Sequence, residues 1–179
     1  MKKFEEKTLS EEKIFDGRII SLFHQKVELP NGKTGTREIV KHPGAVAVIP
    51  ITNEGKIVLV EQYRKALERS LLEIPAGKLE KGEEPLTTAK RELEEETGYV
   101  AAKWEHIQSF YTSPGFADEY IHIYVAKGLQ KLEVSADLDE DEFVEIFELT
   151  VDECLEELKK GSIHDAKTCF AIQFLQLLK

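Results

Sequence analysis

The pattern of hydrophobic and polar positions predicts short strands joined by turns in the first part of the chain. Residues 19–29 (IISLFHQKVEL) are rich in β-formers, and PNGK at 30–33 is a strong turn signal, so we expect 36–41 (TREIVK) to return as a strand. Two apolar, β-branched runs, AVAVIPIT and KIVLVEQ, flank a turn at 53–55. They predict a buried hairpin.

Beyond the hairpin the pattern alternates between loops, helices and further strands. Residues 71–85 (LLEIPAGKLEKGEEP) are interrupted by glycine and proline and predict a loop. The remaining expected elements are strands at 105–111, 120–126 and 142–149, helices at 85–97, 151–161 and 165–178, and an acidic loop at 137–142. This order predicts an α+β fold, with a small N-terminal sheet region (1–42) and a mixed-sheet domain carrying helices (43–179).

The helix expected at 85–97 has clear ends and one apolar stripe. Pro85 suits a first helical position, and Gly98 suits the residue that ends a helix. Leu86, Ala89 and Leu93 recur at helical spacing and mark the face that should pack on the sheet.

Four glutamates crowd the end of this helix in RELEEETG. At about 100° per residue, Glu92, Glu95 and Glu96 share a face that borders the apolar stripe, whereas Glu94 lies on another side. A solvated acidic face is one interpretation. The other is a divalent-metal site, because clustered carboxylates beside a core need a cation, and their oxygens suit Mg²⁺ or Mn²⁺.

Composition narrows the function classes. The 179 residues carry 34 acidic and 24 basic side chains, a net charge of −10, which disfavours a nucleic-acid binder. It leaves room for an anionic substrate if cations screen the site. The chain has no apolar run of membrane-spanning length, no signal-peptide pattern and two cysteines without a metal-binding spacing, so we expect no membrane partner and a cytoplasmic location.

Residues 77–99, GKLEKGEEPLTTAKRELEEETGY, resemble the Nudix box, G-x5-E-x7-R-E-U-x-E-E-x-G-U, where U is a bulky apolar residue. Every fixed place is filled, by Gly77, Glu83, Arg91, Glu92, Leu93, Glu95, Glu96, Gly98 and Tyr99. The resemblance implies an α/β/α sandwich around a mixed sheet. It also implies hydrolysis of a nucleoside diphosphate linked to another moiety, with two or three Mg²⁺ ions per site and Mn²⁺ as a possible substitute.

The family's roles transfer to matching positions. Glu92 and Glu96 would be the principal metal ligands, Glu95 a ligand or an orienter of water, and the carbonyl of Ala76 a further ligand. Arg91, four residues before Glu95, could hold that carboxylate. Glu83 resembles a supporting acid, although it could equally stabilise the start of the helix.

Segments outside the box resemble the ADP-ribose pyrophosphatase branch. They are VEQYRKALERSLLEIPAGKLEKGE before the box, SPGFADE at 113–119, LDEDEFVE at 138–145 and the closing HDAKTCFAIQFLQLL. The resemblance implies conversion of ADP-ribose to AMP and ribose 5-phosphate. The acidic loop could be a solvated surface; alternatively it supplies a general base, Glu142 or Glu140, with Glu142 also a candidate metal ligand.

The same resemblance suggests substrate contacts, namely Arg37, Arg64, Glu73, Ser113, Gly115 and Phe116. It also implies a homodimer in which the N-terminal region crosses to the other subunit and helps to bind adenine. Two alternatives stay open: a Nudix hydrolase of other nucleotide sugars, such as ADP-glucose or GDP-mannose, and a non-catalytic ADP-ribose sensor.

Overall fold

The computed structural model describes residues 3–133 and 143–178. The chain divides into two compact units, one formed by residues 1–44 and 110–121 and the other by 45–109 and 122–179. The sequence predicted a boundary after residue 42, but nothing in the pattern assigned 110–121 to the N-terminal part.

The first unit is built on a three-stranded antiparallel sheet in the order β1-β2-β3. Its strands are β1 (Lys7–Asp16), β2 (Ser21–Glu28) and β3 (Thr34–Lys41). The predicted strands at 19–29 and 36–41 and the turn between them are confirmed by β2 and β3. All ten residues of β1 are exposed, so no alternation of burial marks it as a strand.

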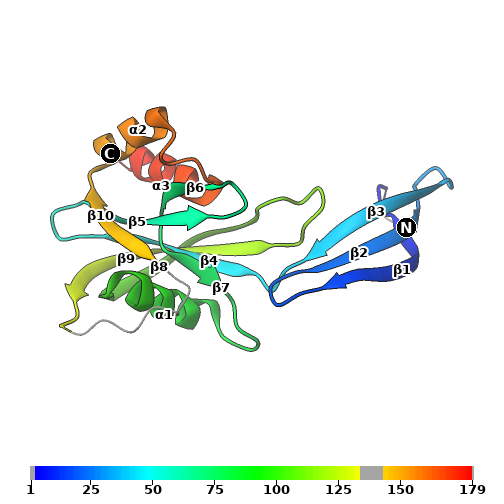
Figure 1. The fold of residues 1–179 in the computed structure, drawn as a ribbon, viewed down its shortest axis with the longest axis horizontal. Helices are drawn as coiled ribbons and strands as arrows, with labels where there is room; N and C mark the ends of the chain where they lie inside the picture. The colour runs from blue at the N-terminus through cyan, green and yellow to red at the C-terminus, as the bar shows by residue number, and fades with distance from the viewer. Residues whose placement is uncertain (1–2, 134–142, 179) are drawn as a thin grey trace. The chain divides into compact units, whose positions relative to one another are not determined.

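The second unit holds a seven-stranded sheet whose main path is β10-β5-β4-β9-β8, with β6 paired to β5 and β7 paired to β4. Its strands are β4 (Ala45–Ile51), β5 (Ile57–Arg64), β6 (Arg69–Glu73), β7 (Ala76–Lys78), β8 (Tyr99–Tyr111), β9 (Tyr120–Lys131) and β10 (Val144–Leu149). In Figure 1, β9 runs in the same direction as its neighbour β4, while β10 and β5 are antiparallel, so the sheet is mixed as predicted.

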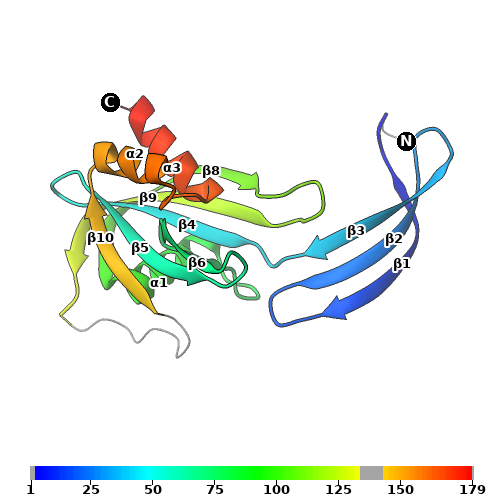
Figure 2. The same ribbon diagram turned by 45° about the horizontal axis from the view of Figure 1, so that its top comes forward.

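Helices cover both faces of this sheet. Helix α1 (Pro85–Thr97) lies on one face, and α2 (Val151–Lys160) and α3 (Ala166–Leu177) pack together on the other (Figures 1 and 2). The three helices match those expected from the sequence, and the arrangement is an α/β/α sandwich. No helix in the described residues is long and apolar enough to cross a membrane.

The prediction of a loop at 71–85 was wrong in part. Its first residues belong to β6, and Ala76–Lys78 form β7, which pairs antiparallel with β4 through Ala45↔Lys78 and Ala47↔Ala76. A three-residue strand containing glycine has no detectable local preference, so it forms because the buried edge of β4 offers it hydrogen-bonding partners.

Helix α1 is attached to the sheet by the predicted stripe, with one exception. Ala89 and Leu93 are fully buried and pack in a cluster with Val46 and Val48 of β4. Leu86, in the first turn, is 37% exposed and does not belong to that cluster. The helix ends at Gly98, whose φ of 66° lets its N–H reach the carbonyl of Glu94 at 2.8 Å.

Candidate active site

The acidic face of α1 borders the core, as its phase relative to the apolar stripe predicted. Glu92 and Glu96 are only 8% and 4% exposed, although both are charged residues. Glu95 is more open, with a third of its side chain exposed. Burial of carboxylates is unfavourable unless each has partners, so the contacts of these residues define the site.

The carboxylate of Glu92 lies directly against the backbone of Gly77. A Cβ atom added at Gly77 would stand 1.9 Å from Cδ, 2.0 Å from Oε1 and 2.3 Å from Oε2 of Glu92. A side chain larger than hydrogen fits between β7 and α1 at this point only if the Glu92 carboxylate moves away. The glycine that begins the box is therefore required for the close approach of the glutamate and not for an unusual φ.

Glu96 reaches the same short strand. Its Oε2 accepts a hydrogen bond from the backbone N–H of Ala76 at 3.1 Å. Two nearly buried carboxylates from successive turns of α1 thus meet β7 at Ala76 and Gly77. The carbonyl of Ala76, predicted from the resemblance as a metal ligand, belongs to this same stretch of backbone.

Arg91 connects the remaining acids. Its Nη1 donates to Oε2 of Glu95 at 2.8 Å and lies 2.9 Å from Oε1 of Glu92, and its Nη2 lies 3.4 Å from Oε2 of Glu83. Burial acts to lower the pKa of Arg91, but its acidic partners outweigh burial and raise the pKa, so the group stays charged. The predicted Arg91–Glu95 contact is present, and Glu83 pairs with Arg91, which leaves both of its predicted roles open.

The donor atoms of these residues are of the type that binds a divalent metal. Carboxylate and carbonyl oxygens are the donors that Mg²⁺ and Mn²⁺ prefer, and the cradle at Gly77 holds one of these carboxylates in place. Among the described residues, however, no group of three or more His, Cys, Asp and Glu side chains converges so that it could hold an ion. The assignment of individual ligands stays a prediction.

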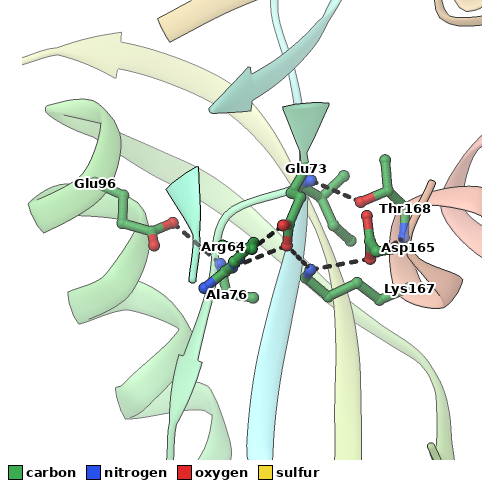
Figure 3. A network of polar contacts seen from close by, with 8 residues as sticks. Arg64, Glu73, Ala76, Glu96, Asp165, Lys167 and Thr168 are labelled. Carbon is green, nitrogen blue, oxygen red and sulfur yellow. Dashed lines mark hydrogen bonds and ion pairs between the residues drawn. The ribbon is translucent and has the colours of Figure 1, made fainter. Parts of the chain in front are cut away.

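A second polar cluster joins the ends of β5 and β6 to α3 (Figure 3). Arg64 donates from Nε to Oε1 of Glu73 at 2.7 Å and from Nη2 to Oε2 at 2.9 Å, a bidentate contact. Lys167 donates to the same Oε2. Burial acts to raise the pKa of Glu73, but Arg64 and Lys167 hold it below its ordinary value.

The start of α3 is fastened to this cluster. Asp165, the residue that caps the helix, accepts from the N–H of Thr168 at 3.1 Å and from Nζ of Lys167 at 2.9 Å, both at Oδ1. The hydroxyl of Thr168 in turn accepts from the N–H of Ile74 at 2.9 Å. Sequence reasoning missed all three side chains. A capping signal marks Asp165, but the Lys167–Glu73 contact spans 94 residues and has no local signature.

Four of the predicted substrate contacts lie in the first unit. Arg37, on β3, donates to the carbonyl of Thr36 at 2.8 Å and pairs with Glu6. The carbonyl of Ser113 accepts from the N–H of Phe116 at 3.1 Å, which closes a turn over Gly115.

This turn is held against β3, because the N–H of Val40 donates to the carbonyl of Phe116 at 2.8 Å. Phe116 itself is 56% exposed. Contact with a substrate stays a prediction for Arg37, Ser113, Gly115 and Phe116, as it does for Arg64 and Glu73. The candidate bases Glu140 and Glu142 lie outside the described residues.

Comparison with known families divides the chain near residue 40. Residues 41–169 match the family model for the NUDIX domain. The chain belongs to the Nudix family. Residues 6–40, which hold β1, β2 and most of β3, match the model of a nucleoside diphosphate sugar hydrolase N-terminal domain.

Two bacterial relatives match over nearly the whole length of this Nudix protein. It is 65% identical over 176 residues to a methanol dehydrogenase activator of Bacillus methanolicus, covering 98% of this chain and 95% of that protein. It is 60% identical over 177 residues to an ADP-ribose pyrophosphatase of Bacillus subtilis (strain 168), covering 99% and 96%. A crystal structure of an ADP compounds hydrolase superimposes with a TM-score of 0.85 at 21% identity, covering 97% of this chain and 94% of that one, and confirms the fold.

Proposed function

We propose that this Nudix protein hydrolyses the diphosphate of ADP-ribose to AMP and ribose 5-phosphate in the presence of Mg²⁺. The observation that carries the proposal is the pair of nearly buried carboxylates, Glu92 and Glu96, held against the backbone of Ala76 and Gly77. Identity of 60% to an ADP-ribose pyrophosphatase over almost the full chain supports the choice of substrate.

Glu92, Glu95 and Glu96, with the carbonyl of Ala76, would hold two or three Mg²⁺ ions, or Mn²⁺ in their place. When bound, these cations neutralise the diphosphate and lower the pKa of the attacking water. That neutralisation accounts for how a protein of net charge −10 binds an anion.

The chain's own residues orient the reaction. Arg91 fixes the carboxylates of Glu92 and Glu95 through ion pairs at 2.9 and 2.8 Å. Arg64 offers a guanidinium to the substrate diphosphate or adenine. Glu142, or alternatively Glu140, would remove the proton from the attacking water.

A hydrolysis panel tests this assignment. Purified protein with Mg²⁺ is compared on ADP-ribose, ADP-glucose, GDP-mannose, NADH and diadenosine polyphosphates, and the products are identified by mass. We expect ADP-ribose to have the highest kcat/KM and to give AMP and ribose 5-phosphate. A different leading substrate would refute the ADP-ribose assignment and leave a Nudix hydrolase of another nucleotide sugar. Absence of cleavage with both Mg²⁺ and Mn²⁺ would favour a non-catalytic ADP-ribose sensor.

We also propose a homodimer in which the N-terminal sheet crosses to the other subunit. The sheet exposes large apolar side chains that a monomer would leave in water, namely Leu9, Ile14, Phe15, Ile19 and Ile20. Light scattering during gel filtration should give twice the chain mass of 20.4 kDa. A monomeric mass at assay concentration would contradict the proposal. We place this dimer in the cytoplasm, where nucleotide substrates are found.

Identity of 65% to a methanol dehydrogenase activator favours a second candidate function, activation of an alcohol dehydrogenase. It is compatible with the first, because one diphosphate hydrolase site could serve both. The test adds the protein with Mg²⁺ to a methanol dehydrogenase and follows NADH formation. A Glu96→Gln variant shows whether any stimulation needs the carboxylates. No stimulation by the wild-type protein would remove this candidate.

A further inference from the structure

Arg64 is held so that one side of its guanidinium faces away from its acidic partner. Nε and Nη2 are both committed to Glu73, and the structure records no partner for Nη1 within the described residues. The side chain is 38% exposed, whereas that of Glu73 is 3% exposed. The pKa of Arg64 is raised mainly by its hydrogen bonds to Glu73 against the effect of burial, with smaller contributions from the charges of Glu96 and Asp165.

The acid that holds Arg64 also creates an electrostatic problem. The charges of Arg64 and Glu73 cancel as a pair, and a neutral pair attracts a diphosphate weakly. Lys167 changes this balance locally, because its ammonium donates to the same carboxylate and takes up part of the negative charge that faces Arg64. Asp165 holds the same ammonium at 2.9 Å, on the side of α3, so the four side chains together are neutral and the effect of Lys167 is on how the Glu73 charge is shared.

Lys167 is one of several contacts that attach α3 to the sheet. The buried hydrogen bond from the N–H of Ile74 to Thr168 already joins helix and strand end, and Asp165 caps the helix independently through the N–H of Thr168. Only 13% of the Lys167 side chain is exposed, and burial of an ammonium is unfavourable. One more attachment of α3 does not by itself explain this burial. Its position beside Glu73 calls for another role.

We propose that Lys167 is a positioning residue for substrate binding. Through Glu73 it fixes the guanidinium of Arg64, and by sharing the Glu73 carboxylate it leaves more of the guanidinium charge available to the diphosphate. The inference rests on the proposed function for the identity of the substrate, and it adds residues of α3 that lie outside the Nudix box to the machinery that selects an anion.

The experiment measures kcat and KM for ADP-ribose with Mg²⁺ in Lys167→Met, Lys167→Arg, Arg64→Ala and the double variant Lys167→Met/Arg64→Ala. Lys159→Met is the matched control, because it makes the same change in an exposed helical lysine that pairs with Glu156. Lys167→Gln removes the charge but keeps a donor, and replaces Lys167→Met if that variant does not fold. Thermal unfolding of every variant reports stability separately.

We expect Lys167→Met to raise KM by about tenfold or more with little change in kcat, as for loss of a charge-assisted contact. Lys167→Arg should restore most of the affinity, and Lys159→Met should match the wild type. In the Arg64→Ala background the Lys167 substitution should have almost no further effect on KM, because the group on which it acts has gone.

Two results would overturn the inference. One is a Lys167→Met variant whose KM is unchanged while stability or kcat falls; the other is an undiminished effect of that change in the Arg64→Ala background. Failure of the proposed function is separable, since it shows as a wild-type protein that does not cleave ADP-ribose. In that case the Kd of ADP-ribose is measured by calorimetric titration without metal for the same variants. A Kd that rises in Lys167→Met but shows no further rise in the double variant supports the inference. A Kd unchanged in Lys167→Met, or effects of the two substitutions that add in the double variant, refutes it.

Discussion

Gly77→Ala is the sharpest test of how the carboxylate site is built. The added Cβ would lie 1.9 to 2.3 Å from three atoms of the Glu92 carboxylate. The ordinary contact distance between such atoms is about 3.5 Å, so the carboxylate would have to move away by more than about 1 Å. Displacement of a reacting or metal-binding group by this amount reduces rates by about a hundredfold.

We therefore expect kcat for ADP-ribose to fall by about a hundredfold in Gly77→Ala, with the far-UV circular dichroism spectrum unchanged. The backbone at Gly77 does not have a positive φ, so the loss arises from the clash and not from backbone strain. Gly35→Ala is the matched control for kcat and folding, because its Cβ would meet only side-chain atoms of Leu29 and Arg37, at 3.4 to 3.5 Å, an ordinary contact. If Gly77→Ala keeps wild-type turnover, the close approach of Glu92 has no catalytic meaning and the argument fails.

Three further substitutions test residues of the second unit, which carries the carboxylate site and α3. Thr168→Val leaves the buried N–H of Ile74 without its acceptor and should lower the free energy of unfolding by about 1–3 kcal/mol in urea denaturation; a loss below about 0.5 kcal/mol would contradict this. The pKa of Glu73 is lowered from 4.5, because its cationic partners outweigh burial, so its stabilisation is complete above pH 4.5 and is lost as pH falls through the lowered pKa. Glu73→Gln should therefore flatten the acid side of the stability–pH profile, and an unchanged slope would refute the assignment. Glu96→Gln should reduce Mg²⁺-dependent turnover at least about tenfold with the fold intact, whereas Glu94→Gln, from another side of α1, should not.

Much of the site could be predicted from local sequence, because it is built on one helix. The turn of about 100° per residue predicted that Glu92 and Glu96 would share a face beside Leu93, and the structure confirms that both are nearly buried there. The i, i+4 spacing likewise predicted the contact of Arg91 with Glu95. Positions related by helical periodicity need no knowledge of the rest of the chain.

Other features had no such periodicity. β7 is too short to show a strand pattern, and it exists because β4 supplies its hydrogen-bonding partners. The exposed position of Leu86 follows from where the first turn of α1 meets the sheet, which the apolar stripe alone cannot state. The strand β1 escaped detection because its side chains are exposed on both faces.

The sequence by itself determined the family, the helix that carries the glutamates and the residue types suited to a divalent metal. These depend on spacing within about twenty residues, where backbone geometry is regular. Only the tertiary structure decided that Gly77 leaves the space into which the carboxylate of Glu92 fits, and that Glu73 is shared between Arg64 and Lys167. Such contacts join elements that fold together only when the core forms, because burial of apolar surface, and no local rule, brings their side chains into reach.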